Sequence, residues 1–279
     1  MQENKIIHNN QSLELLNGNL SSLGSELYEH IKLRKNSIEI NADGMHYRDL
    51  NYLIKNISKM SKKIILRNIS GQRYIGTTLC KNVVMEIYGT PGNDLGSFMD
   101  GAEISVNGNV QDGCGNTMNR GCIMIKGSAG DILGYSMRGG KIFVRDDVGY
   151  RVGIHMKEYK ENRPCIVVGG TAADFLGEYM AGGILVILGL NLEKEKIHNA
   201  KYVGTGMHGG VIYIHGEVTH TGKEVEMKSL NESDKILLKG LVMEYCKYFN
   251  IINSNEIIKR EFSKLIPVST RPYGDLYAY

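Results

Sequence analysis

Apolar and polar positions recur through the middle of the chain with a period close to 19 residues. Between residues 71 and 216, seven units each place an apolar residue, a glycine, two variable residues and a Met or Leu in that order. The glycine-to-glycine steps are 20, 19, 19, 19, 24 and 27 residues. The units are Ile75–Leu79, Leu95–Met99, Cys114–Met118, Leu133–Met137, Val152–Met156, Leu176–Met180 and Val203–Met207.

A short strand is predicted after the Met in five of these units. Apolar residues lie five and seven positions after the Met, as Ile104 and Val106 do after Met99, and a glycine or aspartate follows. This alternation is typical of a half-buried strand, and a fixed short period indicates a solenoid. Glycines at the corners supply positive φ. We therefore predict a parallel β-helix of about seven coils, with the Met residues in one buried column.

The residues before the repeat predict a small α/β unit that covers the first coil. Residues 12–34 are expected to form one or two short helices, and 37–40 a strand followed by a turn at 41–44. Apolar residues at helical spacing predict a helix over 47–60, and 63–66 reads as a strand. Because an open β-helix end exposes strand edges, a cap is needed there.

The pattern changes again after residue 216. A helix is predicted over 234–249, with Ser233 as its N-cap, and a second helix over 256–265 that ends before Pro267. These helices are expected either to cap the far end or to dock a partner. The expected segments are an N-terminal cap (1–66), the β-helix (67–222) and a C-terminal helical segment (223–279).

Two coils carry polar, charged insertions, at Lys157–Pro164 and Leu190–Ala200. Such insertions map to exposed loops of a solenoid and often carry its binding face.

Composition excludes several classes of protein. The 279 residues carry 33 basic and 30 acidic side chains, a balance that gives no support for nucleic-acid binding. The longest apolar run, Ile184–Leu188, is far too short to span a bilayer, and the polar start shows no secretory signal. Five cysteines without a Cys-x-x-Cys pair favour the reducing cytoplasm, and Cys114 occupies a core position of the repeat.

Three candidate chemical motifs are better explained by the repeat. Gly204–Gly209 fits G-x-G-x-x-G, but a strand is expected after it where a dinucleotide site needs a helix. Asp94, Asp112, Asp131 and Asp174 recur before the repeat glycines, and we expect them to form turns within their own corners. His208 and His215 lack the further ligands that a metal site requires.

The polar corner residues form a weaker candidate set, expected on one face of the solenoid: Arg138, Arg145, Arg151, Glu178 and Tyr179. No nucleophile has a base near it in sequence. We therefore assign no catalytic, cofactor-binding or metal residue.

The repeats resemble a known family. The segments Leu95–Gly101, Leu133–Gly140, Gly177–Gly183 and Gly204–Gly210 look like the GXGXG β-helix domain that closes the large subunit of glutamate synthase. That domain also occurs as a separate chain and as one of the subunits of formylmethanofuran dehydrogenase. The resemblance covers about 150 residues, on the order of one domain, and implies a right-handed β-helix. In glutamate synthase the domain carries no catalytic residue and joins the amidotransferase and flavin-binding synthase domains.

The resemblance leads to a functional prediction. We expect a cytoplasmic, non-catalytic structural subunit of a glutamate-synthase-type oxidoreductase, which makes glutamate from glutamine and 2-oxoglutarate in nitrogen metabolism. Its partners would be amidotransferase and flavin/iron–sulfur chains, because this chain has Gln2 after Met1, no cysteine cluster and too few residues for a flavin barrel, which needs about 250. The alternatives are a scaffold like the β-helix subunit of formylmethanofuran dehydrogenase, or an independent small-ligand-binding protein. A cofactor bound to the isolated chain would separate an enzyme from a scaffold.

Overall fold

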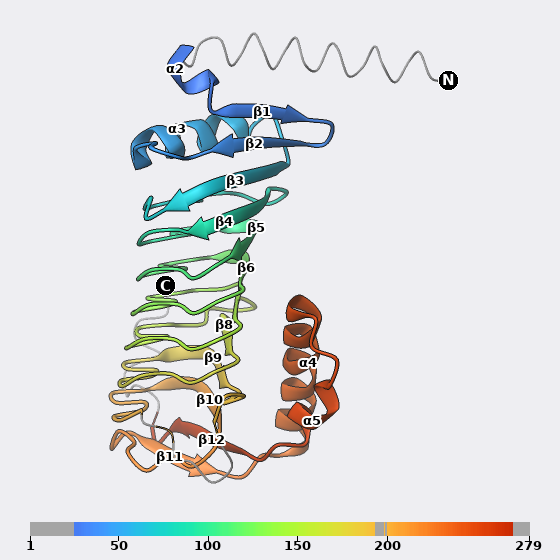
Figure 1. Ribbon diagram of the computed structural model, residues 1–279. Coiled ribbons are helices and arrows are strands. Elements are labelled where there is room, and N and C mark those ends of the chain that lie inside the picture. The colour runs from blue at the N-terminus through green and yellow to red at the C-terminus, as the bar shows by residue number, and fades with distance from the viewer. Residues whose placement is uncertain (1–24, 193–197, 199, 270–279) are drawn as a thin grey trace.

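The fold is one long twelve-stranded sheet wound into a solenoid (Figure 1). The computed structural model describes residues 25–192, 198 and 200–269. The strands are β1 (Ile31–Arg34), β2 (Ser37–Asn41), β3 (Lys63–Ser70), β4 (Val84–Thr90), β5 (Asp100–Asn107), β6 (Arg120–Ile125), β7 (Lys141–Val144), β8 (Cys165–Val168), β9 (Ala181–Ile187), β10 (Gly209–His215), β11 (Val225–Lys228) and β12 (Phe262–Pro267). The helices are α2 (Ser25–Tyr28), α3 (Tyr47–Ile57), α4 (Glu232–Phe249) and α5 (Ser254–Ile258).

The predicted parallel β-helix is confirmed. Every neighbouring pair from β2 to β10 is parallel, and the pairs follow chain order. The seven repeat glycines sit in stacked corners that are separated by six coil-to-coil steps. The solenoid therefore makes about six turns, slightly fewer than the seven coils predicted.

The corners share one backbone conformation. In every corner the repeat glycine and the residues two before and two after it all have positive φ, as Ile132, Gly134 and Ser136 do. The N–H of each repeat glycine donates to a carbonyl of the preceding coil, that of the residue just before its repeat glycine. An example is the 2.8 Å bond from Gly134 N–H to the carbonyl of Cys114, which precedes Gly115. This corner bond recurs at all six steps with lengths of 2.7–2.8 Å.

The central position of each corner requires glycine for space in the core as well as for φ. A Cβ on Gly134 would lie 2.4 Å from Cδ1 of Ile166, inside the core. Ile132 and Ser136 share the positive φ but are only half-buried, so their side chains fit outside the core. Left-handed φ costs a non-glycine residue about 1–2 kcal/mol, and the corner bonds offset that cost at the flanking positions.

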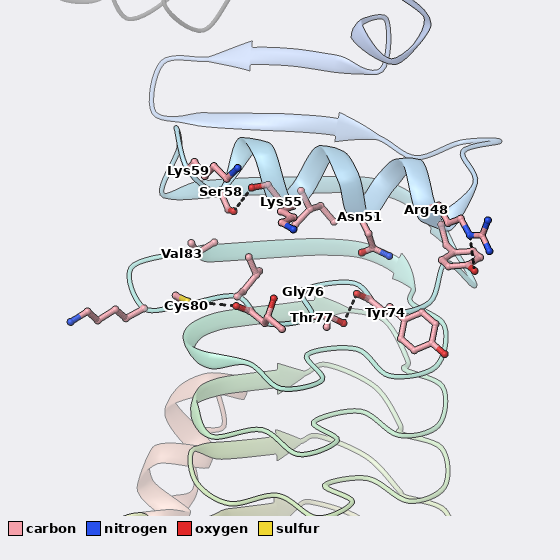
Figure 2. A pocket seen from close by; sticks show the side chains of 15 residues that line it. Arg48, Asn51, Lys55, Ser58, Lys59, Tyr74, Gly76, Thr77, Cys80 and Val83 are labelled. Carbon is pink, nitrogen blue, oxygen red and sulfur yellow. Dashed lines mark hydrogen bonds between the residues drawn. The ribbon is translucent and has the colours of Figure 1, made fainter. Parts of the chain in front are cut away.

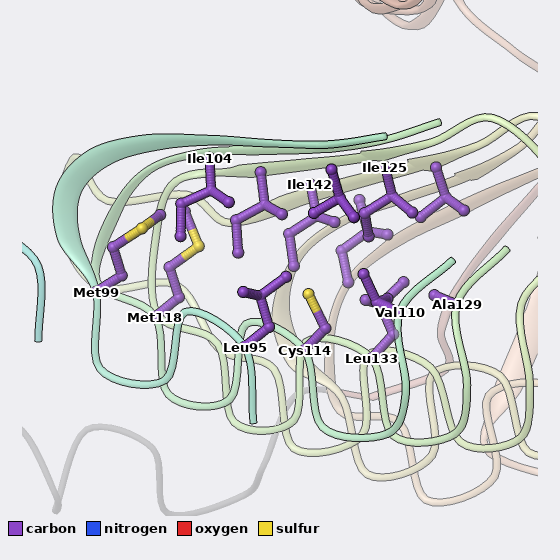
Figure 3. Packing of buried hydrophobic residues seen from close by; sticks show 14 of the residues in the cluster. Leu95, Met99, Ile104, Val110, Cys114, Met118, Ile125, Ala129, Leu133 and Ile142 are labelled. Carbon is purple, nitrogen blue, oxygen red and sulfur yellow. The ribbon is translucent and has the colours of Figure 1, made fainter. Parts of the chain in front are cut away.

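The core runs the length of the solenoid as stacked apolar columns (Figure 3). The predicted methionine column is confirmed, because its six members are at most 1% exposed: Met99, Met118, Met137, Met156, Met180 and Met207. Cys114 is buried between Leu95 and Leu133 in the column before the glycines, as its position in the repeat indicated.

The N-terminal unit closes one end with an antiparallel hairpin and a helix. β1 pairs with β2, and α3 connects β2 to its parallel neighbour β3, where it occupies the place of a coil corner. The strand at 37–40 and the helix at 47–60 are confirmed, although α3 ends at Ile57. The helices expected over 12–34 are wrong for residues 31–34, which form β1, because pairing with β2 decides the conformation; residues 12–24 lie outside the described residues.

The C-terminal segment departs further from expectation. The first predicted helix is confirmed as α4, but its N-cap is Asn231, which forms a capping box with Asp234, and not Ser233. The second predicted helix is wrong beyond Ile258, because residues 262–267 form β12 between β10 and β11. These two antiparallel strands close the far end, while α4 lies along the lateral face of the sheet (Figure 1). No helix in the described part of the chain is long and apolar enough to cross a bilayer.

Removing one internal member of the methionine column tests the core. We expect Met137→Ala to lower the free energy of unfolding by about 2–5 kcal/mol, because Met137 is fully buried. Urea titration followed by circular dichroism measures this loss, and Met243→Ala on the exposed face of α4 is the matched control. Equal effects of the two substitutions would contradict a buried column.

A pair of glycine substitutions separates backbone strain from core packing. Gly134 and Gly71 both have positive φ, but a Cβ on Gly71 meets nothing within 4 Å. We expect Gly71→Ala to cost about 1–2 kcal/mol and Gly134→Ala clearly more, because the new methyl overlaps Ile166. The same urea titration compares them, and an equal loss would show that φ alone selects glycine in the corners.

Candidate functional site

The corner face of the solenoid carries a series of exposed aromatic side chains. Five aromatic residues in corner segments are between 40% and 53% exposed: Tyr74, Phe98, Tyr150, Tyr179 and Tyr202. They come from five of the seven corners, so they extend along the length of the rod. Exposed aromatic rings of this number are typical of surfaces that bind another protein.

Aromatic side chains from successive coils stack on one another across this face. The His155 and Tyr179 rings are parallel, with centroids 5.4 Å apart, and Phe175 stacks on Tyr202 at 5.0 Å. Gly206 makes room for this arrangement, because a Cβ there would lie 2.4 Å from the Tyr179 ring. The corner spacing thus produces a rigid, partly aromatic surface.

Next to the stacked pair lies a basic hollow of about 340 Å³. Its lining includes two permanent cations and two histidines but no carboxylate: Ser136, Arg138, His155, Lys157, Tyr179, Ala181 and His208. Neither Arg138 nor Lys157 forms an ion pair with any described residue. The charge of the hollow is therefore uncompensated, and the hollow is suited to an anionic group.

The polar corner residues singled out in the sequence do not all lie together. Arg138 and Tyr179 line the hollow, and Arg151 bonds Glu178 of the next coil at 2.9 Å while its guanidinium covers the Phe175 ring. Arg145 does not belong to this group. It pairs with Asp146, and its carbonyl accepts a bond from Tyr245 of α4.

The recurring aspartates act between coils, and the expectation that they bond within their own turns is wrong for three of them. Asp112 accepts from the backbone N–H of Asp131, and Asp131 in turn accepts from Tyr150, at 2.9 and 2.8 Å. Asp174 accepts from the Lys201 N–H at 2.8 Å. Asp94 accepts from the Asn116 side chain of the next coil at 2.9 Å and also from the Ser97 hydroxyl of its own corner at 3.3 Å. The next coil offers a backbone donor that linear sequence does not reveal.

The histidines and cysteines remain separate groups. His208 Nδ1 lies 3.1 Å from the Gly206 carbonyl, and His215 Nδ1 lies 2.8 Å from that of Glu261. No cluster of three or more His, Cys, Asp or Glu suited to a metal occurs among residues 25–192, 198 and 200–269. All five cysteines are free, and Cys80 is the exposed one.

Burial raises the pKa of four cysteine thiols: Cys114, Cys122, Cys165 and Cys246. It raises the pKa of the Cys122 and Cys165 thiols to about 12, so both stay protonated at neutral pH.

The G-x-G-x-x-G segment lies in the seventh corner. Gly204 and Gly206 have positive φ there, and the chain continues directly into β10, as the repeat predicted.

The first insertion forms a small hairpin beside the hollow. Tyr159 and Asn162 exchange backbone hydrogen bonds at 3.0 Å, with Lys160 in the left-handed conformation between them. Glu158 anchors the hairpin by accepting from Gly183 N–H at 3.0 Å. Residues 157–163 are exposed. Residues 193–197 and 199 of the second insertion lie outside the described residues.

The lateral face of the sheet is already covered by α4. Outward side chains of β7 to β10, such as Phe143, Val186 and Tyr213, form a second apolar cluster with Leu241 and Tyr245 of the helix. The sequence predicted this helix, but it did not identify the strands that the helix covers.

Asp234 anchors the N-terminus of α4. It accepts bonds from the Tyr213 hydroxyl at 2.6 Å and from Lys264 of β12 at 2.8 Å. Although burial acts to raise it, bonds from Lys264 and Tyr213 hold the pKa of Asp234 below its usual value. This carboxylate thus connects β10, β12 and α4.

The comparisons with known proteins agree with the geometry. The family described as "GXGXG motif" matches residues 24–269. An uncharacterized protein of Methanocaldococcus jannaschii is 46% identical over 250 residues, which cover 86% of this chain and 96% of that protein. A chain from the crystal structure of the formyltransferase/hydrolase complex of Methylorubrum extorquens, in complex with methylofuran, is 18% identical with a TM-score of 0.53. The match covers 73% of this chain and 72% of that chain, and the likeness concerns the fold.

The Asp234 anchor leads to a prediction about the attachment of α4. We expect Asp234→Asn to cost about 1–3 kcal/mol, because the Lys264 ammonium loses its buried partner. Hydrogen exchange of the α4 amides, faster in the variant, measures the effect. Glu232→Gln, which affects only the exposed pair with Lys235, is the control.

The same anchor predicts a pH dependence. Because the folded pKa of Asp234 is depressed, its contribution is complete above the unfolded value of about 3.9 and is lost as pH falls through the lower folded value. In the wild type, the opening free energy obtained from α4 amide exchange, after correction for the intrinsic rate, should fall in this acidic range more than in Asp234→Asn. An identical acid response of the two proteins would contradict the assignment.

Proposed function

The chain belongs to the GXGXG-motif family, and on this premise we propose that it is a structural subunit that holds catalytic partner chains together. In this role it catalyses no reaction itself. The glycines, methionines and aspartates of the repeat serve the corner bonds and the core, so the repeat itself supplies a surface and not a reaction centre.

The exposed aromatic corner face is the observation that carries this proposal. Helix α4 covers the sheet face of β7 to β10, whereas five corner aromatics remain exposed along the rod: Tyr74, Phe98, Tyr150, Tyr179 and Tyr202. A partner chain that covers these rings would bury apolar surface at little entropic cost, because the corner backbone is already ordered. The rod is therefore suited to contacts at several coils at once.

The partner complex we favour is a glutamate-synthase-type oxidoreductase in the cytoplasm, with separate amidotransferase and flavin/iron–sulfur chains. The repeat segments that resemble the glutamate synthase domain support it. The alternative is a scaffold like the β-helix subunit of formylmethanofuran dehydrogenase, and the likeness of fold to a chain of the formyltransferase/hydrolase complex supports that alternative. Both complexes use several chains, and both versions of the proposal require protein partners.

The hairpin of residues 157–164 is the contact we consider first. It projects beside the basic hollow, so a partner that binds it also reaches the uncompensated charge of Arg138 and Lys157. The second insertion, Leu190–Ala200, is the other candidate for the contact.

Co-purification tests the scaffold. The chain isolated from its native cells should bring down other chains, and mass spectrometry should identify an amidotransferase or flavin-bearing chain. Replacing residues 159–162 by two glycines, which keeps the Glu158 acceptor of the Gly183 N–H, should release the partner while the urea midpoint stays unchanged. The control variant, Lys239→Ser on the exposed face of α4, should keep it.

Two results would overturn the proposal. One is a chain that elutes alone from native extract, and the other is turnover of glutamine or 2-oxoglutarate by the purified chain. Recovery of a formyltransferase would instead support the alternative complex.

A further inference from the structure

The two ends of the corner column are closed differently. Within the stack, each corner forms three backbone hydrogen bonds with the preceding coil. The N–H of the repeat glycine donates to that coil, and two carbonyls of the corner accept from backbone N–H groups of that coil. The first corner has no preceding coil. Its glycine N–H belongs to Gly76, and its two carbonyls belong to Arg73 and Thr77.

Helix α3 replaces one of the three missing partners. The Asn51 side chain donates to the Arg73 carbonyl at 2.9 Å, as a backbone N–H of a preceding coil would. No described residue accepts from Gly76 N–H or donates to the Thr77 carbonyl. Gly76 is buried, and a buried backbone N–H without a partner is rare.

At the far end, the last corner has three groups that face away from the stack, and the chain provides partners for two of them, whereas the Tyr202 N–H has no partner among the described residues. There the Glu224 carboxylate accepts from Gly206 N–H at 3.0 Å, and Gly222 N–H donates to the Val203 carbonyl at 2.8 Å. The chain thus supplies an acceptor and a donor for its last corner, but it leaves a donor and an acceptor open at its first corner.

These open groups line a groove of about 680 Å³ between α3 and the first coil (Figure 2). Figure 2 shows Asn51 and Lys55 of α3 directed toward that coil. Four basic side chains line the groove and no carboxylate does. They come from α3, from the turn after it and from the loop before β4: Arg48, Lys55, Lys59 and Lys81. None of the four forms an ion pair with a described residue.

The walls of the groove are apolar as well as charged. Ile54, Leu79 and Val83 contribute aliphatic surface, and the Tyr47 and Tyr74 rings, with centroids 6.1 Å apart, stand at one end. The groove therefore combines an open hydrogen-bonding edge, an aliphatic lining and positive charge. A free inorganic anion would use the charge alone.

We propose that this groove binds an extended acidic segment of a partner protein, which continues the hydrogen-bond ladder of the first corner. A peptide carbonyl accepts from Gly76 N–H, a peptide N–H donates to the Thr77 carbonyl, and carboxylate side chains pair with Lys55 and Lys59. Addition of a strand to an open edge is an established mode of peptide recognition. The site stands apart from the 157–164 hairpin. That the peptide belongs to a partner chain depends on the proposed scaffold role, whereas the ability of the groove to bind an acidic peptide does not.

Peptide binding to the purified full-length chain tests the site directly. The probe is a fluorescein-labelled (Glu-Val)4 peptide, followed by anisotropy, with (Lys-Val)4 as the peptide control. We expect only the acidic peptide to bind, and Lys55→Glu/Lys59→Glu to weaken it about tenfold or more. The matched control Lys239→Glu/Lys247→Glu makes the same change of net charge on α4 and should leave binding unchanged.

Two further measurements test the ladder and the location. An acidic peptide with alternate N-methyl groups should bind far more weakly, because it cannot donate to Thr77. The bound peptide should slow maleimide labelling of Cys80, which lines the groove and is exposed.

Several outcomes would overturn the proposal. Equal binding of the N-methylated peptide would reduce the site to a charged patch, and tighter binding of an oligouridylate would make it a nucleic-acid site. A dimer of this chain that the lysine substitutions dissociate, without any peptide binding, would make the groove a self-association surface. Failure of co-purification alone would count against the scaffold role, whereas failure of peptide binding counts against this groove.

Discussion

The corner hydrogen bond, from a repeat glycine N–H to the preceding coil, is the interaction on which the rest of the structure depends. It requires a left-handed backbone, and at the central position it also requires the absence of a Cβ, which would enter the core. Once these bonds stack, the strands must pair in parallel and in register, and the methionines must align. The core, the sheet and the exposed corner face are consequences of one local geometry repeated at a fixed spacing.

The same geometry decides which surfaces are free. Side chains at the central corner position would point inward, so the flanking positions carry the variation and display it outward, as Ser136, His155 and Tyr179 do. The strand faces opposite the core are apolar enough to need cover, and α4 provides it over β7 to β10. The proposed partner surface is therefore what remains after the fold has satisfied its own backbone and core.

The sequence predicted what the period encodes. Glycine, methionine and alternating strand residues recur at fixed offsets, so the coils, the buried column and the strand after Gly204–Gly209 could be inferred. Helix 47–60 was visible because Leu50, Leu53 and Ile54 share a face, and only its last turn differs.

The rest depends on partners that are distant in sequence. Residues 262–267 alternate weakly and form a strand because β10 offers an open edge. The N-cap of α4 is Asn231 because its side chain and that of Asp234 each accept from the other's backbone N–H. The sequence does not show this choice, because Ser233 is an equally suitable capping residue two positions later. The bonds from aspartates to the next coil, and the role of Asn51 as a substitute for a missing coil, are likewise decided by the stacking. The groove beside Asn51 could not be predicted, since its open groups are backbone atoms.

The two long steps in the repeat have a consequence for how such a chain can diverge. Across the steps of 24 and 27 residues the strands still pair in the register of the repeat, Lys141 with Cys165 and Ile184 with Val211. Lengthening a flexible loop costs little, about 0.6 kcal/mol for each doubling. Insertions can therefore accumulate in the loops between a corner and a strand without changing the core. The core residues are constrained by packing, whereas the loop residues are free to change with the partner. Chains of this kind can acquire new partners by adding loops to an inherited frame.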